Sequence, residues 1–227
     1  MGYQYLLIDN DNTLMDFNAA ERQALSETLV NAGLPADKDT CEAYHRINDA
    51  LWKALERGET TQALLKVERF RQLLQYLNRT DIDENEIAAA YAHNLGNYAD
   101  LLPGADHFIR SLHGKIKIAL ISNGVSSIQR SRLALCPLTE LFDVILISEE
   151  VGAAKPDPKM LFMALEKMGC TDKTKAVMMG DSLSADIPAA INAGVDSIFF
   201  SLKGKTSPLP TYTVNCYEKA LAILLAE

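Results

Sequence analysis

Two aspartates, Asp9 and Asp11, directly follow the apolar segment YLLI at residues 5–8. Because successive residues of an extended chain point to opposite faces, residues 9 and 11 can lie on the same side. Two like charges held that close repel each other unless a cation or a shared proton compensates them. The pair therefore indicates a cation site or an acid–base pair at the end of a buried strand.

Two simpler explanations of this stretch were considered. A calcium-binding EF-hand loop would need Gly at its sixth position and Glu at its twelfth, but these positions hold Leu14 and Ala20. An ordinary turn rich in Asp and Asn fits the stretch taken alone. A catalytic role needs partners from other strand ends, because ligands of open α/β sheets bind outside the carboxyl ends of the strands.

Three further apolar runs lead to groups that suit a phosphate or a metal ion. The run IALI ends in Ser-Asn-Gly at residues 122–124, where a hydroxyl and backbone N–H groups precede a helix expected to begin near residue 126. Lys155 follows a second run, and Asp181 and Asp186 follow a third. Each group alone could be a turn, a surface cation or a helix cap. Their repeated position after apolar runs favours one shared site.

The elements that must position these residues form an α/β pattern. Strands are predicted at five runs rich in aliphatic residues, namely YLLID, IKIALIS, DVILIS, AVMMGD and SIFFS. The later runs alternate with helical patterns, which predicts a doubly wound, Rossmann-like parallel sheet covered by helices on both faces. We expect this core domain to comprise residues 1–15 and 101–227, with residues 16–100 inserted as an all-helical cap domain.

The insert contains several amphipathic helix patterns. Asn18, with Glu21 three residues later, resembles a capping box at the start of the first helix. A second pattern places apolar residues on one stripe, which is expected to face the interior of the insert: Leu64, Val67, Phe70, Leu74 and Leu77.

Composition limits the class of protein. The 227 residues carry a formal net charge of −8 and no block of Lys or Arg, so we expect no nucleic acid polymer as a partner. The four cysteines are widely spaced and predict free thiols. Neither a signal peptide nor a membrane span is indicated, so we expect a cytoplasmic protein without membrane attachment. The sequence leaves open whether it is a monomer or a homodimer.

Taken together, the motifs resemble the four motifs of the haloacid dehalogenase superfamily of phosphohydrolases, in which the helical insert corresponds to the cap. The resemblance rests on Asp9-x-Asp11-x-Thr13, Ser122-Asn123-Gly124, Lys155-Pro156 and Gly180-Asp181-(x)4-Asp186. It implies Mg²⁺ as cofactor and an aspartyl-phosphate intermediate.

The resemblance also implies a role for each motif residue. Asp9 would be the nucleophile and Asp11 the general acid and base. The implied Mg²⁺ ligands are the carboxylates of Asp9 and Asp181 and the backbone carbonyl of Asp11. The remaining implied roles are phosphate binding by Ser122 and the Asn123 backbone N–H, charge compensation by Lys155, orientation of Lys155 or a metal-bound water by Asp186, and loop fixation through hydrogen bonds by Thr13.

Within the superfamily, ISEEVGAAKP and NDALWKALERGETT are similar to bacterial pyrimidine 5'-nucleotidases. The expected substrate is therefore a small phosphorylated metabolite, foremost a pyrimidine nucleoside monophosphate. Phosphoglycolate or sugar phosphate hydrolysis, a phosphomutase and a non-catalytic binding protein remain alternatives. Haloacid dehalogenation needs neither a metal nor an acid, so Asp11 and Asp181 argue against it. The cap residues that could contact a base are Phe17, Asn48 and Trp52, together with Tyr44 and His45, although an aromatic residue more often packs in a core.

Overall fold

A parallel sheet forms the centre of the computed structural model, which describes residues 2–226. Within these residues the sheet has six strands in the order β3-β2-β1-β4-β5-β6. The strands are β1 (Tyr5–Ile8), β2 (Lys117–Ser122), β3 (Val144–Ile147), β4 (Ala176–Gly180), β5 (Asp196–Phe200) and β6 (Tyr212–Val214). Ile8 pairs with Leu120 on one side and with Met179 on the other, so the carboxyl ends of β1, β2 and β4 lie at one edge.

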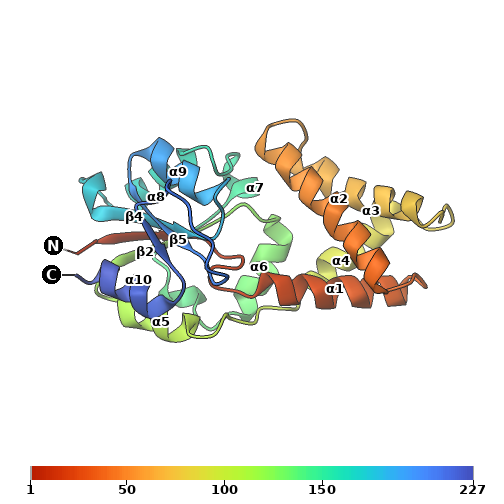
Figure 1. Ribbon diagram of the computed structural model, residues 1–227, viewed down its shortest axis with the longest axis horizontal. Coiled ribbons are helices and arrows are strands. Elements are labelled where there is room, and N and C mark those ends of the chain that lie inside the picture. Colours follow the sequence, from red (N-terminus) through yellow and green to blue (C-terminus); the bar gives the residue numbers. More distant parts are fainter. Residues whose placement is uncertain (1, 227) are drawn as a thin grey trace.

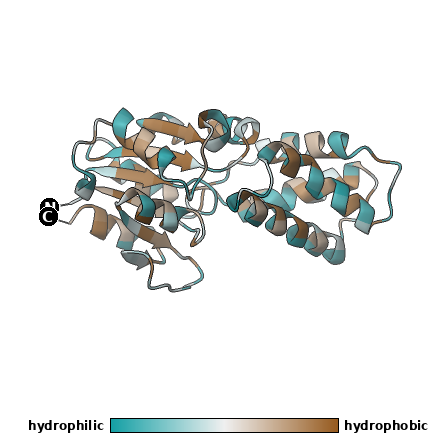
Figure 2. Ribbon diagram, turned by 90° about the horizontal axis from the view of Figure 1, so that it is seen from above, coloured by the Kyte–Doolittle hydropathy of each residue, from teal (hydrophilic) through white to brown (hydrophobic). Residues whose placement is uncertain are grey.

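Helices cover both faces of this sheet, as the apolar strands require. Leu6 of β1 packs into one core with α5 (Ala105–Leu112) and α10 (Tyr217–Leu224). Leu7 points the other way, into a core with α8 (Lys159–Lys167) and α9 (Asp186–Ala193). Figure 2 shows the resulting apolar strands, with more polar surfaces on the surrounding helices. The predicted doubly wound α/β fold is confirmed.

One strand escaped the sequence-based prediction. β6 was not expected, because it has only three residues and two of them are exposed. It pairs with β5 at the edge of the sheet and follows the turn-rich segment 201–211.

Four helices lie outside the sheet layers and form a separate body, which we call the cap (Figure 1). They are α1 (Phe17–Asn31), α2 (Lys38–Glu56), α3 (Gln62–Tyr76) and α4 (Glu84–Gly96). Their buried side chains make a core of their own, which includes Leu25, Leu29, Tyr44, Phe70 and Tyr91. The three aromatic rings of this core pack with centroids 5.2 to 5.7 Å apart.

Two details of the cap differ from expectation. Asp16, and not Asn18, caps α1, because its carboxylate accepts a hydrogen bond from the Ala19 N–H at 2.9 Å. Leu64 is 63% exposed and does not belong to the buried face of α3. That face runs instead through Leu65, Arg69 and Leu73, which follow one another at intervals of four residues.

The cap meets the sheet domain through two linkers and across a cleft. Met15 of the first linker forms a β-bridge with Leu101 of the second. Helix α6 (Ser126–Leu135) lies between the sheet and the cap in Figure 1, and α7 (Ser148–Val151) follows β3. Short 3₁₀ helices occupy Thr139–Leu141 and Lys173–Lys175. Across the cleft, Gln62 Nε2 donates to the Asn123 carbonyl at 2.8 Å.

None of the helices within residues 2–226 combines the length and the apolar character that crossing a bilayer requires.

Candidate active site

The strand ends bring the sequence motifs to one place. Asp9 follows β1, Ser122 ends β2 and Asp181 follows β4. Between these ends and the cap lies a cleft of about 710 Å³. Its lining includes the motif residues Asp9, Asp11, Ser122, Asn123, Lys155, Asp181 and Asp186.

Lys155 is the cation at the base of this cleft. Its side chain is buried, and Nζ donates to Asp9 Oδ1 at 2.6 Å and to the Ile121 carbonyl at 2.7 Å. Nζ also lies 2.7 Å from Asp186 Oδ1. Burial opposes the charge on this amine, but the carboxylates of Asp186 and Asp9 outweigh it and raise the pKa of Lys155 above its ordinary value.

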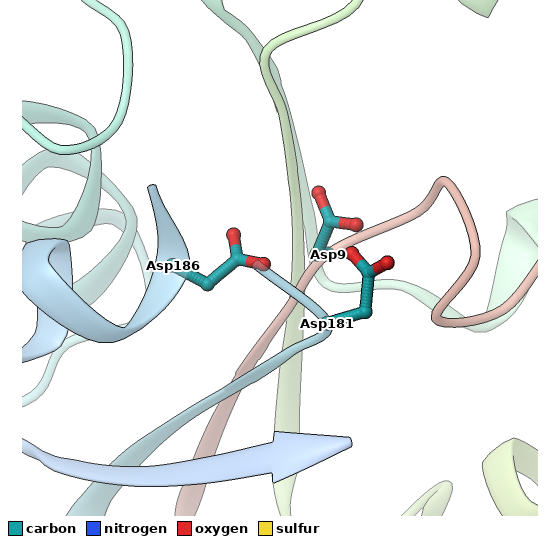
Figure 3. Close-up of side chains that lie close together, drawn as sticks. All are labelled: Asp9, Asp181 and Asp186. Carbon is teal, nitrogen blue, oxygen red and sulfur yellow. The ribbon is translucent and has the colours of Figure 1, made fainter. Parts of the chain in front are cut away.

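Three carboxylates lie close together here, and Lys155 is ion-paired with two of them, Asp9 and Asp186. An oxygen from each of Asp9, Asp181 and Asp186 lies within 4.8 Å of the others, and Figure 3 shows the side chains converging from β1, β4 and the start of α9. Burial raises the pKa of Asp9 well above its usual range, with Lys155 opposing and the neighbouring acids adding to the rise. Burial and the Asp186 charge raise the pKa of Asp181 to about 7. The excess of negative charge fits a bound cation.

Two glycines make room for buried side chains at this edge. A Cβ atom on Gly180 would lie 2.1 Å from Asp186 Oδ2, which is closer than any real contact. A Cβ on Gly124 would lie 2.3 Å from Gln129 Nε2. Glycine therefore serves close approach of a side chain at both positions, and not a positive φ, which neither residue adopts.

The Asp11 carboxylate is held by helix α6. Its Oδ2 accepts from Gln129 Nε2 at 2.6 Å, and its Oδ1 is paired with Arg132 Nη1. Sequence reasoning missed both α6 residues. The only signal was their spacing of three, which places polar groups on one side of a helix and is common on solvent-exposed faces.

The expected hydrogen bonds of Thr13 come from its backbone. The Thr13 carbonyl accepts from Tyr217 Oη at 2.7 Å, and the Thr13 N–H donates to the Asn10 carbonyl at 3.3 Å. The Thr13 hydroxyl is buried and has no hydrogen-bond partner among residues 2–226. Main-chain contacts thus fix the loop after β1.

The loop after β2 is tied to the loop that carries Lys155. Asn123 Nδ2 donates to the Lys155 carbonyl at 2.7 Å, and its Oδ1 accepts from the Lys155 N–H at 2.8 Å. The Ser122 hydroxyl accepts from the Gly124 N–H at 3.0 Å. Helix α6 begins at Ser126 as expected, but Glu149 already occupies the Ser126 N–H. The Ser122 loop therefore offers the better phosphate position.

The cap contributes an aromatic and polar wall. Phe17, Asn48 and Trp52 line the cleft, whereas Tyr44 is fully buried in the cap core. His45 Nδ1 lies 3.3 Å from Glu21 Oε2, and His45 is not among the residues that line the cleft. The suggestion that Tyr44 stacks on a ligand is wrong, because neighbouring rings enclose it.

Glu21 and Arg69 line the cleft, although the sequence analysis assigned neither residue to the site. Asn48 Nδ2 donates to Glu21 Oε1 at 3.1 Å, and Arg69 Nη1 donates to Asn48 Oδ1 at 3.3 Å. The Arg69 guanidinium lies 4.6 Å from the Tyr91 ring centroid. This buried polar chain holds Asn48 in a fixed orientation at the cleft wall.

Known proteins are similar in sequence to this chain over nearly its full length. It is 34% identical to the pyrimidine 5'-nucleotidase PynA of Streptococcus pneumoniae, covering 99% of this chain and 96% of that protein. It is 30% identical to the pyrimidine 5'-nucleotidase YjjG of Escherichia coli, covering 95% of each.

A solved structure is similar over the whole fold. The HAD-hydrolase YfnB of Bacillus subtilis, solved bound to magnesium, is 31% identical with a TM-score of 0.92 and covers 99% of this chain and 100% of its own. Residues 3–194 match the family model of the haloacid dehalogenase-like hydrolases. Since these matches agree with the fold and with the acidic cleft, the chain belongs to the haloacid dehalogenase-like hydrolase family and is a phosphohydrolase.

Proposed function

We propose that this enzyme hydrolyses pyrimidine nucleoside 5'-monophosphates with Mg²⁺ through a phosphorylated Asp9. The observation that carries the chemistry is the group of three neighbouring carboxylates at the carboxyl edge of the sheet, two of which are ion-paired with Lys155. The two nucleotidase relatives support the substrate class.

The acidic cluster suits Mg²⁺, which prefers oxygen ligands. The carboxylates of Asp9 and Asp181 and the backbone carbonyl of Asp11 would hold the ion. Asp186 is less available, because Lys155 contacts its Oδ1 and the Ser182 N–H donates to its Oδ2 at 3.0 Å. When bound, Mg²⁺ would neutralise charge on the phosphoryl group.

Asp9 and Asp11 act in both halves of the reaction. The Asp9 carboxylate forms a bond to phosphorus while the bond from phosphorus to the ester oxygen breaks, and that oxygen takes a proton from Asp11. In the second half, Asp11 takes a proton from the water that attacks the phosphoryl group, and Asp9 is released. Ser122 and the Asn123 N–H would bind the phosphoryl oxygens, while Lys155 offsets the charge of Asp9.

The cap wall suits a nucleoside. Phe17 and Trp52 offer aromatic surface to a base, and the oriented Asn48 offers an amide for hydrogen bonding. A purely aliphatic or fully charged wall would favour a different class of phosphate ester.

A substrate panel tests this proposal. We expect kcat/KM with Mg²⁺ to be highest for pyrimidine nucleoside monophosphates, compared with purine nucleoside monophosphates, sugar phosphates and phosphoglycolate. A preference for sugar phosphates or phosphoglycolate would refute the substrate class and leave the chemistry in place. Isomerised phosphate ester in place of free phosphate would instead indicate a phosphomutase.

A further inference from the structure

Helix α6 supplies two buried side chains that the proposed mechanism does not use, Gln129 and Arg132. Gln129 is 1% exposed and Arg132 is fully buried. Burying a guanidinium is costly unless an anion compensates it. Within residues 2–226, the only carboxylate ion-paired with Arg132 is that of Asp11. Arg132 Nη2 has no partner there, so the contact with Asp11 carries the charge compensation.

Each of the two side chains donates a hydrogen bond to a different carboxylate oxygen of Asp11. Gln129 Nε2 donates to Oδ2, and Arg132 Nη1 donates to Oδ1. Each carboxylate oxygen has two lone pairs, so a second position on each stays available for a proton. The α6 donors can therefore fix the plane of the carboxyl group without blocking proton transfer.

The orientation of the Gln129 amide is itself fixed. Asn10 Nδ2 donates to Gln129 Oε1 at 2.6 Å, which leaves Nε2 as the group that faces Asp11. The absence of a side chain at Gly124 provides the space, since a Cβ there would lie 2.3 Å from Nε2. The loop after β2 is thus shaped around the Gln129 side chain.

Arg132 also lies against the linker that follows α4 and against the first residue of α1. Its Nε donates to the Tyr98 carbonyl at 2.8 Å, in the linker that follows α4. Its guanidinium carbon lies 5.7 Å from the ring centroid of Phe17, at the start of α1. A movement of the cap would displace Phe17 and the Tyr98 carbonyl, and the same guanidinium holds Asp11.

We propose that Gln129 and Arg132 are positioning residues for Asp11, and that Arg132 ties the orientation of this acid to the position of Tyr98 and Phe17 at the base of the cap. This inference rests on the proposed function, because it assigns the α6 residues to the proton-transfer step. In that step the Asp9–phosphorus bond forms, the bond to the ester oxygen breaks with its electron pair staying on that oxygen, and the proton moves from Asp11 to it.

The step predicts a dependence on the leaving group. A nucleoside leaves as a poor alkoxide and needs the proton, so a misplaced acid slows phosphorylation of the enzyme. p-Nitrophenolate leaves without protonation. A loss of acid positioning should therefore reduce kcat/KM for the nucleotide and spare kcat/KM for p-nitrophenyl phosphate, because kcat/KM reports the steps up to departure of the leaving group.

The experiment compares Gln129→Leu, Arg132→Met and Arg132→Lys with the wild-type enzyme on both substrates in the presence of Mg²⁺. Arg130→Met is the matched control, since Arg130 lies on the same helix, is exposed and pairs with Glu150. General acid catalysis contributes about 10²- to 10⁴-fold, so we expect the first two variants to lose about 10- to 100-fold on the nucleotide. We expect changes of less than about threefold on p-nitrophenyl phosphate, and partial recovery in Arg132→Lys.

Gln129→Leu keeps the test decisive if Arg132→Met fails to fold. It removes a neutral side chain, with its hydrogen bonds to Asp11 and from Asn10, and leaves the ion pair between Arg132 and Asp11 in place. In an Asp11→Asn background, adding Gln129→Leu should change the nucleotide rate little, because the group to be positioned is gone. Equal losses on both substrates, or no loss on the nucleotide, would overturn the inference. If the wild-type enzyme prefers another alkyl phosphate, the proposed substrate is wrong, and the same comparison on that ester decides the inference.

Discussion

Removing metal from the cleft should make the protein's stability depend on pH in a defined direction. Asp181 has its pKa raised from 3.8 to about 7 by burial first and by the Asp186 charge second. A carboxyl group with a raised pKa binds its proton more tightly in the folded state. Its contribution to stability is complete below pH 3.8 and is lost as pH rises through about 7.

The magnitude follows from the two pKa values. For a single group that titrates at 3.8 when unfolded and at about 7 when folded, the free energy of unfolding falls by about 2.5 kcal/mol between pH 5 and pH 7.5. Mg²⁺ bound to the ionised carboxylate should reverse this loss. The ion should therefore stabilise the protein more at pH 7.5 than at pH 5.

Urea unfolding of chelator-treated protein at the two pH values measures this difference, with and without Mg²⁺. The hydrogen bond to Glu21 raises the pKa of His45, so the stability that this pair contributes to the protein also falls as the pH rises. The pH dependence of the wild type alone therefore cannot be assigned to Asp181. Asp181→Asn tests the contribution, because it keeps the His45 pair and removes the carboxyl group, together with one of the charges that raise the pKa of Asp9. The pH-dependent loss should be smaller in this variant by about 2.5 kcal/mol.

Two results would refute the reasoning. Equal pH dependence in the wild type and in Asp181→Asn would show that Asp181 titrates near its ordinary pKa. Equal stabilisation by Mg²⁺ at pH 5 and at pH 7.5 would show that metal binding is not linked to a proton on this cluster.

Three substitutions test the other parts of the cleft. Asp9→Asn should abolish turnover and the acid-stable phosphoenzyme label. It should also raise the urea midpoint of the metal-free protein at pH 7.5, since a buried charge is removed. Retained turnover would exclude Asp9 as the nucleophile. Lys155→Met should lower the free energy of unfolding by about 3–5 kcal/mol in chelator, because two buried carboxylates lose their cation; an unchanged midpoint would contradict this. Gly180→Ala should displace Asp186, which orients Lys155, and should lower kcat at least about tenfold. A kcat equal to that of the wild type would contradict this role of Asp186.

The strand-end motifs could be predicted from the sequence because they interrupt apolar runs. Leu6, Leu7 and Ile8 are buried on both faces of the sheet, so a carboxylate at residue 9 is conspicuous. The short edge strand β6 had no such contrast, since two of its three residues are exposed. At the start of α1, Asp16 and Asn18 are both good caps, and only the backbone path selects Asp16.

The partners of these carboxylates were harder to predict. Gln129 and Arg132 belong to a polar stretch of α6 that resembles a solvated helix face. Their burial depends on Asp11, more than a hundred residues earlier in the chain, and, for Arg132, on the linker after α4, whose Tyr98 carbonyl accepts a hydrogen bond from it. Local periodicity contains no information about such a partner, because long-range packing decides whether an arginine is surface or core.

The ion pairs of the cleft suggest why Asp181 is the carboxylate left for a metal. Lys155 compensates Asp9 and Asp186, and Arg132 compensates Asp11. Within residues 2–226 no cation is ion-paired with Asp181, and its pKa is raised to about 7. A protein that buries a carboxyl group without a side-chain cation must keep it protonated or supply a charge from outside. Since Asp181 stands beside Asp9, the proposed nucleophile, at adjacent strand ends, an external cation there would be placed where the phosphoryl charge has to be neutralised.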